Sequence, residues 1–412
     1  MTKTYLIAAL AAAALAVPAF GAEPLKSDLK GVTDTAIKVG WMGDETGGSA
    51  SVQLPDLAGL QAYAAYINAH GGVLGRQLQI INLDDKWAPD NATVNFRRLV
   101  NDDQVIAIAN IGGSQNSTPL APAVHAAKIP VIFPVQTVDA QVQTPYFFNL
   151  IAHYADQADV IVAAAAKKVG GPSKLNMYVA RLNVPSGQEF DEYAQRALKT
   201  QGARYAGTAT MGATQNDYTP TVLQIKTAVE AGANYVALHG ALRTAIGLLA
   251  ALDKANVTVP VIGITAHAAP SLYKALSPEV IGRFTSIQSV LPPNSDSAGT
   301  RELQAYVKAN PQRGDDALEP FFSLGWLTGE VLKQGIETAV KDTGGTLTRE
   351  TLYRALSGKF DARGLTCQMD FTGDKMHYTA CLTTFGWNGT ALVPTEQFST
   401  FDPVFQRKYG LQ

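Results

Sequence analysis

The chain has 412 residues, of which 46% are hydrophobic and 17% are charged. This composition is that of an ordinary soluble globular protein, and the length suits roughly two domains. The formal net charge is only −2, and no basic run is long enough to follow a phosphate backbone. We therefore expect no nucleic-acid partner.

The first 22 residues have the pattern of a secretory signal peptide. Lys3 supplies the positive start, residues 6–17 are apolar, and Ala19, Gly21 and Ala22 form a small-residue cleavage region. An uncleaved anchor is the alternative, although the apolar stretch is short for spanning a bilayer. We expect a protein that is exported to the periplasm and has no membrane helix in its mature part.

Short apolar runs alternate with helical patterns from residue 37 onward, which predicts doubly wound parallel sheets. The expected strands are 37–42, 78–83, 106–109 and 129–133, then 174–180, 203–210, 235–238, 259–264 and 284–290. The expected helices are 55–69, 91–101 and 120–127, then 188–201, 218–231, 244–256 and 319–341.

The stretch 106–137 is interpreted as strand, glycine turn, helix, strand and a second polar turn. Gly113 and Ser114 lie just before its alanine-rich helix. The first N–H groups of a helix lack partners within it and favour an anion. Ligands of open α/β sheets bind beyond the carboxyl ends of strands, where Ser114, Val135 and Thr137 would meet. Simple helix capping is the alternative role of these hydroxyl groups.

The two cysteines, Cys367 and Cys381, flank a short alternating segment with a turn near Gly373. This pattern predicts a hairpin that places them opposite each other, and export favours a cross-strand disulfide. Closing a loop of this length stabilises a fold by roughly 3 kcal/mol in the chain-entropy model.

Motifs for catalysis or metal binding are not found in the sequence. Its six histidines lack metal-ligand spacing, and no P-loop, GxGxxG or GxSxG motif follows a strand. The pair Asp84 and Asp85 is more typical of a turn than of an acid/base dyad. We expect binding rather than turnover, with no metal and no cofactor.

Four stretches resemble the leucine/isoleucine/valine-binding proteins of ABC importers, which are type I periplasmic binding proteins. They are IKVG; INAHGGVLGRQLQIINLDD, with a proline four residues further on; RRLVNDDQVIAI; and GGSQNSTPLAPAVHAAKIPVIFP. The INAxGGxxGR pattern is the most specific part, and weaker similarity continues to about residue 395.

The resemblance implies an α/β fold of two doubly wound lobes joined by a three-stranded hinge. Residues 1–22 would be the signal peptide, 33–149 plus 289–366 lobe 1, and 150–288 plus 367–400 lobe 2. The chain would cross between the lobes near residues 149, 288 and 366, where a few connecting residues can absorb lobe closure.

The resemblance also places a carboxylate site on the hydroxyls of Ser114 and Thr137, helped by backbone groups at Gly113 and Val135. In lobe 2 the chain departs from the amino-acid binders. Ser186 replaces an aromatic residue, Ala241 and Leu242 replace a tyrosine pair, and Thr265 replaces the acidic partner of the ligand ammonium. A buried ammonium without a carboxylate costs several kcal/mol, so these changes favour a ligand without an α-amino group.

Arg181, His239 and His267 end strands of lobe 2 and would face the ligand instead. An arginine can pair with a carboxylate or lie on an aromatic ring. A surface ion pair is the alternative for the arginine, and a structural role is the alternative for the histidines. Trp41 and Trp87 would pack in the core or wall an aromatic ligand.

These features predict a monomeric periplasmic solute-binding protein that closes over a small carboxylate, an aromatic or other organic acid. It would deliver this ligand to the permease and ATPase subunits of an ABC importer. A branched-chain or hydrophobic amino-acid or amide binder is one alternative, since an ammonium could find Asp44, Glu45 or Asp139. A ligand-sensing lobe for a membrane receptor is the alternative from another class.

Overall fold

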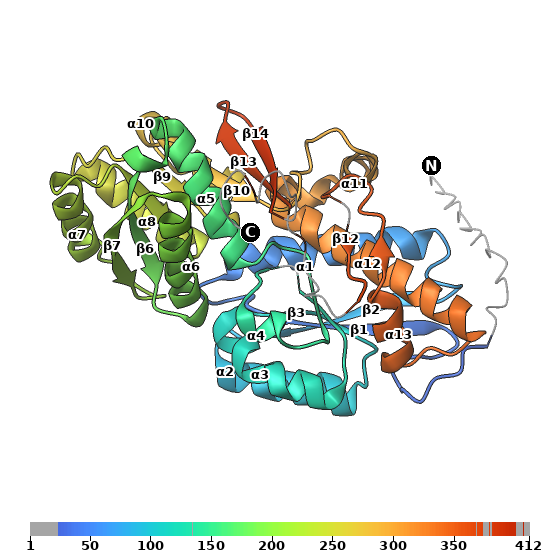
Figure 1. Ribbon diagram of the computed structural model, residues 1–412. Coiled ribbons are helices and arrows are strands. Elements are labelled where there is room, and N and C mark those ends of the chain that lie inside the picture. The colour runs from blue at the N-terminus through green and yellow to red at the C-terminus, as the bar shows by residue number, and fades with distance from the viewer. Residues whose placement is uncertain are drawn as a thin grey trace, which may run out of the picture.

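The computed structural model describes residues 24–400 except 134, 368, 374–378 and 380, together with residue 407. The predicted signal peptide and His377 lie outside these residues. The chain forms two α/β lobes, one from its blue, cyan and orange parts and the other mainly from its green and yellow parts (Figure 1). We call the lobe built on the first sheet lobe 1 and the lobe built on the second sheet lobe 2.

Lobe 1 contains a five-stranded parallel sheet in the order β2-β1-β3-β4-β5. Its strands are β1 (Ala36–Gly43), β2 (Gln77–Asp84), β3 (Ile108–Ile111), β4 (Val131–Phe133) and β5 (Phe147–Asn149). β3, β4 and β5 are buried along their whole length, as expected for apolar strands covered on both faces.

Lobe 2 contains a seven-stranded sheet in the order β14-β13-β10-β9-β8-β6-β7. Its strands are β6 (Asn176–Leu182), β7 (Arg204–Met211), β8 (Tyr235–Leu238), β9 (Val261–Gly263), β10 (Phe284–Gln288), β13 (Cys381–Trp387) and β14 (Leu392–Ser399). The first five are parallel, and β13 and β14 are antiparallel additions. The parallel parts of both sheets therefore have the same order, with a switch point between the first and third strands.

Helices cover both sheets. Those of lobe 1 are α1 (Ala50–Ala69), α2 (Pro89–Arg97), α3 (Ser114–Ala127), α4 (Asp139–Val142), α11 (Ala298–Ala309), α12 (Pro320–Thr343) and α13 (Arg349–Leu356). Those of lobe 2 are α5 (Tyr154–Val169), α6 (Pro185–Gln201), α7 (Thr219–Glu230), α8 (Leu242–Lys254), α9 (Pro270–Lys274) and α10 (Pro278–Ile281). Short turns of other helix types are η1 (Arg98–Asp102), η2 (Pro172–Lys174), η3 (Thr265–His267) and η4 (Pro311–Leu318).

The predicted alternation of strands and helices is confirmed, but some helix boundaries differ from the predicted ones. α1 and α3 begin well before Pro55 and Pro119, where the sequence pattern placed polar turns. A proline removes one hydrogen bond from a helix interior. The turn before each proline is nevertheless helical, and it contains buried residues such as Gln53 in α1 and Asn116 in α3. The polar residues before each proline are thus the first turn of a helix.

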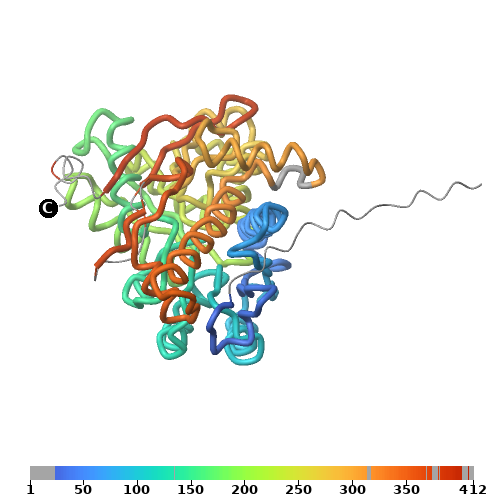
Figure 2. The backbone as a smooth tube through the Cα atoms, turned by 90° about the vertical axis from the view of Figure 1, so that its right-hand side faces the viewer, coloured from blue at the N-terminus to red at the C-terminus, as the bar shows by residue number. Residues whose placement is uncertain are grey.

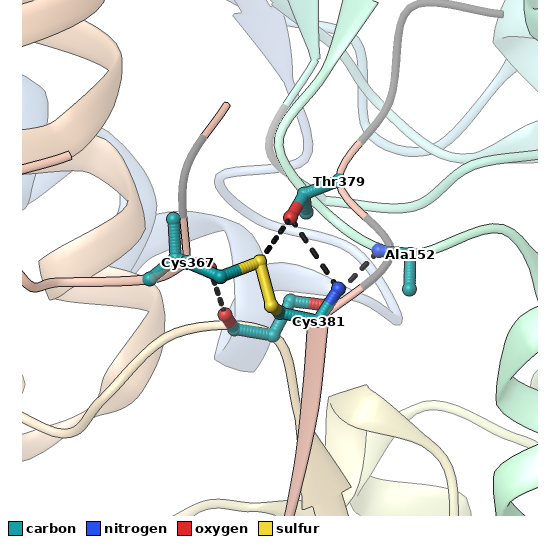
Figure 3. The surroundings of a disulfide bond; sticks show 6 residues. Ala152, Cys367, Thr379 and Cys381 are labelled. Atoms are coloured by element: carbon teal, nitrogen blue, oxygen red, sulfur yellow. Dashed lines mark hydrogen bonds between the residues drawn. A yellow bond between two sulfur atoms is a disulfide. The ribbon is translucent and has the colours of Figure 1, made fainter. Parts of the chain in front are cut away.

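The predicted disulfide between Cys367 and Cys381 is present, with the two Cα atoms 5.9 Å apart. It lies beside Thr379 and Ala152 (Figure 3). The predicted hairpin is wrong, because β12 (Met369–Asp370) pairs with β11 (Lys359–Phe360) and β13 pairs with β10 and β14. The alternating pattern was correct for strands, but their partners lie elsewhere in the chain.

Three connections between the lobes meet at Ser289, directly after β10. The Ser289 hydroxyl accepts a hydrogen bond from the backbone N–H of Ala152 at 2.9 Å. The Ser289 carbonyl accepts one from the hydroxyl of Thr366 at 2.5 Å. Segments after β5, after β10 and before Cys367 are therefore joined at one point, close to the predicted crossings. The exact lobe boundaries stay a prediction.

Helices α1 and α12 pack with their backbones in close approach, α1 blue and α12 orange in Figure 2. A Cβ atom at Gly325 would lie 1.9 Å from the carbonyl oxygen of Asp56, and one at Gly59 would lie 2.1 Å from that of Phe322. Only glycine fits at such a distance. Among the described helices, none combines the length and the apolarity needed to cross a membrane.

We expect Gly325→Ala to destabilise the protein by about 1–3 kcal/mol, because the helices must move apart to admit the methyl group. Alanine's better helix propensity works in the opposite direction and is smaller, about 1 kcal/mol. Urea unfolding measures the change. Gly282→Ala is the control, since its Cβ would meet nothing nearer than 3.5 Å. Equal midpoints for both variants would contradict this packing.

Candidate functional site

A cavity of about 50 Å³ lies between the two lobes. Its lining comes from both lobes, and all of it from segments that follow strands or begin helices. Lobe 1 supplies Ser49, Val52, Gln53, Trp87, Gly113, Ser114, Val135 and Gln136. The connection after β5 and lobe 2 supply Tyr154, Leu182, Val184, Ser186, His239, Gly240, Ala241, Ile264 and Ala266.

The topology of the sheets explains this position. The carboxyl ends of β1 and β3 flank the switch point of the first sheet, and those of β6 and β8 flank the switch point of the second. Open α/β sheets bind ligands at such points. Here both switch points face the same cavity, so residues distant in sequence meet there.

Four helices have their N-caps in the wall of the cavity. The N-caps of α1, α3, α6 and α8 are Ser49, Gly113, Val184 and Ala241, and none makes a side-chain capping hydrogen bond. Each helix N-terminus carries partial positive charge and N–H groups without helical partners. The wall therefore favours an anion.

Ser114 and Ser186 meet across the cavity and join α3 to α6. The hydroxyl of Ser114 donates to the hydroxyl of Ser186 at 3.1 Å and accepts from the backbone N–H of Ser186 at 3.2 Å. Both side chains are buried, at 2% and 3% exposure. The contact closes the lobes on each other at the first turns of two helices.

Trp87 is held rigidly beside the start of α3. Its backbone N–H donates to Asp85 at 2.8 Å, and its carbonyl accepts from Gln115 at 2.7 Å. Its φ is +57°, a left-handed conformation that is uncommon for an aromatic residue. A Cβ at Gly113 would lie 2.3 Å from the indole Nε1, so this close contact requires glycine. The indole N–H has no hydrogen-bond partner among the described residues.

Five of the ten predicted ligand residues line the cavity. They are Gly113, Ser114, Val135, Ser186 and His239. The other five, Thr137, Arg181, Leu242, Thr265 and His267, do not line it. Their chain neighbours Gln136, Leu182, Ala241, Ile264 and Ala266 do. At the end of β6, successive side chains point to opposite sides, so Leu182 lines the cavity and Arg181 does not. Leu242, Thr265 and His267 lie in helical turns, where one step along the chain rotates the side chain by roughly 100° or more.

Thr137 and Arg181 have partners within the protein. The Thr137 hydroxyl donates to the carbonyl of Ile151 at 2.5 Å. The Arg181 guanidinium forms an ion pair with Asp191 at 3.3 Å, the alternative considered for this residue. Thus neither hydroxyl nor guanidinium is directed to the cavity, contrary to the sequence-based expectation.

Leu242, Thr265 and His267 are buried beside the wall. Leu242 is the first residue of α8, and only its predecessor Ala241 reaches the cavity. The Thr265 hydroxyl and backbone N–H both donate to the side-chain oxygen of Gln157, at 3.3 and 3.2 Å. His267 is fully buried, and burial lowers its pKa to about 3.

Among the described residues that line the cavity, none is charged. The acids considered as ammonium partners are bound elsewhere: Asp44 accepts from Ser49 at 2.6 Å, Glu45 from Asn82 at 3.0 Å, and Asp139 from Tyr193 at 2.5 Å. Trp41 is a core residue whose indole N–H donates to Asp56. The site therefore offers neutral polar groups and backbone dipoles.

Sequence reasoning missed most of the apolar wall and four polar side chains, which are Ser49, Gln53, Gln136 and Tyr154. Gln53 lies in the first turn of α1, which the sequence pattern placed in a loop. Its side chain binds the loop after β1, accepting from Asp44 N–H at 3.0 Å and donating to Ser49 at 2.6 Å. A position directly after a strand is the signal that could have identified Gln136.

A second polar cluster joins the lobes at Asp139, His153 and Glu189, whose ligand-type atoms all lie within 4.8 Å of one another. The backbone N–H of Asp139 donates to Glu189 at 3.1 Å, and His153 Nε2 lies 2.9 Å from the Asp139 carboxylate. The Ala155 N–H donates to His153 Nδ1, so the proton of the neutral ring is on Nε2 and faces Asp139. Hydrogen bonding accounts for this cluster.

Two carboxyl groups of this cluster have shifted pKa values. The hydrogen bond from His153 is the largest cause that lowers the pKa of Asp139. Burial raises the pKa of Glu189 to about 7. Closure of the lobes thus places a carboxyl group with a raised pKa against α4.

Comparisons with known proteins give the family. The family model described as periplasmic binding protein matches residues 36–391. An amino acid binding protein of Pseudomonas aeruginosa is 31% identical over 101 residues, which are 24% of this chain and 27% of that protein.

Solved structures show the same fold. A branched-chain amino acid ABC transporter protein of Thermus thermophilus with bound valine has a TM-score of 0.81 at 17% identity, covering 93% of this chain and 99% of that one. A fatty acid ABC transporter substrate-binding protein of Thermomonospora curvata has 0.79 at 20%, covering 92% and 95%. A solute binding protein of R. palustris in complex with 4-hydroxybenzoate has 0.74 at 17%, covering 88% and 97%. Because the family model spans most of the chain, this protein belongs to the periplasmic binding protein family.

Proposed function

We propose that this protein is the solute-binding component of an ABC importer and that its ligand is a small organic acid without an α-amino group. The cavity between two lobes, with four uncapped helix N-termini and no charged lining among the described residues, carries this proposal. The ligand carboxylate would replace the direct contact between Ser114 and Ser186 and accept from both hydroxyls.

Electrostatics favours such an acid over a zwitterion. An anion gains from the helix dipoles and from N–H groups that lack helical partners. An ammonium would add a positive charge beside the same dipoles without a carboxylate in the lining, and burying it unpaired is costly. The α-amino group is therefore the part of an amino acid that this site does not accommodate.

The size of the cavity restricts which acids can bind. The cavity of about 50 Å³ is smaller than the roughly 150 Å³ that accommodates benzene. Any acid whose carboxylate replaces the contact between Ser114 and Ser186 requires the lobes to part there, and an aromatic acid requires a larger movement than a short aliphatic acid. The structural relatives bind ligands of different types, namely valine, a fatty acid and 4-hydroxybenzoate, so both sizes are in range for this fold.

The remaining assignments belong to the same proposal. The protein acts as a monomer after removal of its signal peptide, and closed lobes present the ligand to the permease and ATPase subunits. Binding rather than turnover is its activity. An amino-acid or amide binder is the second candidate, supported by the 31% identity to an amino acid binding protein over 101 residues.

A thermal-shift screen tests the ligand class. Aliphatic and aromatic carboxylic acids should raise the midpoint of unfolding, because ligand at about 100 times Kd stabilises by about 2.7 kcal/mol. Leucine, isoleucine and valine should give no shift. A shift with these amino acids and none with the acids would overturn the proposal.

Ser114→Ala should weaken binding of an acid found in this screen by about 1–3 kcal/mol, because the carboxylate loses a buried donor. Titration calorimetry measures the difference. Ser117→Ala is the control in the same helix, since its hydroxyl accepts from Gln141 at 3.0 Å and does not line the cavity. Equal losses of affinity in both variants would remove Ser114 from the site.

Affinity should fall as pH rises from 5.5 to 7.5, by up to about tenfold per pH unit. Closure raises the pKa of Glu189 to about 7, so the closed state binds a proton that the open state has released. Above this pKa the affinity should become constant. Glu189→Gln should flatten the profile, whereas Glu192→Gln, an exposed residue one turn further, should not. Parallel profiles for all three proteins would contradict the coupling.

A further inference from the structure

His239 is a buried histidine in the wall of the cavity whose ring has polar atoms to offer. It follows β8 directly, and its backbone N–H donates to the carbonyl of Ala180 at 2.8 Å. The side chain is 2% exposed, and neither Nδ1 nor Nε2 has a hydrogen-bond partner among the described residues. Unpaired buried polar atoms are rare and costly, so we expect this ring to bind a group that the described residues do not supply.

Aromatic packing fixes the ring. It stacks on Phe190 with centroids 5.7 Å apart and planes at 28°, and the ring of Tyr154 lies 5.3 Å away. Gly187 adds to the packing, since a Cβ there would lie 3.3 Å from the imidazole Cε1. Phe190 stacks on the imidazole and Tyr154 and Gly187 pack around it, so the ring is held in place in the wall of the cavity.

The ring is neutral when buried here. Burial, with smaller contributions from the nearby His267 and Arg181, lowers the pKa of His239 to about 3. A neutral imidazole has one N–H donor and one nitrogen acceptor. A hydroxyl group can serve either nitrogen, because it both donates and accepts. The apolar neighbours Leu182 and Ile264 give no competing polar group.

We propose that His239 determines specificity by hydrogen bonding an uncharged hydroxyl group of the ligand, which makes the ligand a hydroxylated small organic acid. This inference rests on the proposed function, because the carboxylate is held by Ser114 and the helix N-termini. The hydroxyl is a second recognition point, supplied by lobe 2. Its hydrogen bond forms only when the lobes close, so it links ligand identity to closure.

Matched pairs of acids that differ by one hydroxyl group test the inference. Titration calorimetry compares butanoate with 4-hydroxybutanoate, and 3-phenylpropanoate with 3-(4-hydroxyphenyl)propanoate. In at least one pair, the hydroxylated acid should bind the native protein roughly tenfold tighter or more. In His239→Phe, which retains a stacking ring, the ratio of the two affinities within a pair should fall to within about twofold, and this ratio reports the lost hydrogen bond whatever the change in overall affinity.

His267→Phe is the matched control, because this histidine is also buried but does not line the cavity. Its preference for the hydroxylated acid should survive. Nitrogen NMR of the native protein gives an independent measurement if a variant does not fold. The ring nitrogens of His239 should shift with the hydroxylated acid and stay unchanged with its partner.

Two results separate the inference from the function on which it rests. In the first, the acids bind and binding depends on Ser114, but the two acids of each pair bind equally or His239→Phe keeps the same preference. This result overturns the role of His239 and leaves the proposed function standing. Ring nitrogen resonances of His239 that do not shift with the hydroxylated acid would also overturn the role of His239. If none of the four acids binds, the proposed ligand class is wrong and this inference falls with it.

Discussion

The hydrogen bonds at Ser289 join three connections and thereby control how the two lobes meet. Its hydroxyl holds the segment after β5 through Ala152, and its carbonyl holds the returning segment through Thr366. The disulfide from Cys367 then attaches the returning segment to β13 of the second sheet. Because each lobe is built from distant parts of the chain, this junction sets the position of one sheet against the other, together with the contacts at Ser114–Ser186 and Asp139–Glu189.

This junction places the two switch points face to face, and the electrostatics of the site follows. Helices start at both switch points, so their N-termini converge on one small space without any charged side chain in the described lining. Four partial positive charges then act in one small space between the lobes. Backbone geometry thus favours an anion independently of the particular side chains, in line with the proposed ligand class.

Side chains decide which anion is accepted. Trp87 and His239 are held by packing and backbone hydrogen bonds, and both present polar atoms that the described chain does not satisfy. Rigid groups of this kind discriminate well between ligands, because a ligand that leaves them buried and unpaired binds less tightly. The cluster at Asp139 and Glu189 adds a second polar contact between the lobes. We propose that binding and closure are coupled through both regions.

The sequence by itself determined the alternation of strands and helices, the pairing of the two cysteines and the placement of Gly113 and Ser114 beside the start of a helix. These features depend on local apolar spacing, on the export signal and on turn chemistry, all of which are readable along the chain. Resemblance to a family supplied the two-lobed arrangement, which periodicity could not give, because strands such as β13 join a sheet formed much earlier in the chain.

Only the tertiary structure decided which residue at each strand end faces the ligand. Thr137 and Arg181 were chosen for their chemistry, yet Gln136 and Leu182 line the cavity. In lobe 2, Ala241 and Ala266 face it, and Leu242 and Thr265 do not. Neighbouring side chains point to opposite sides at the end of β6 and are rotated by roughly 100° or more at the starts of α8 and η3, so an error of one residue changes the assignment. That residue is fixed by how the strand pairs and where the next helix begins, which are properties of the folded chain.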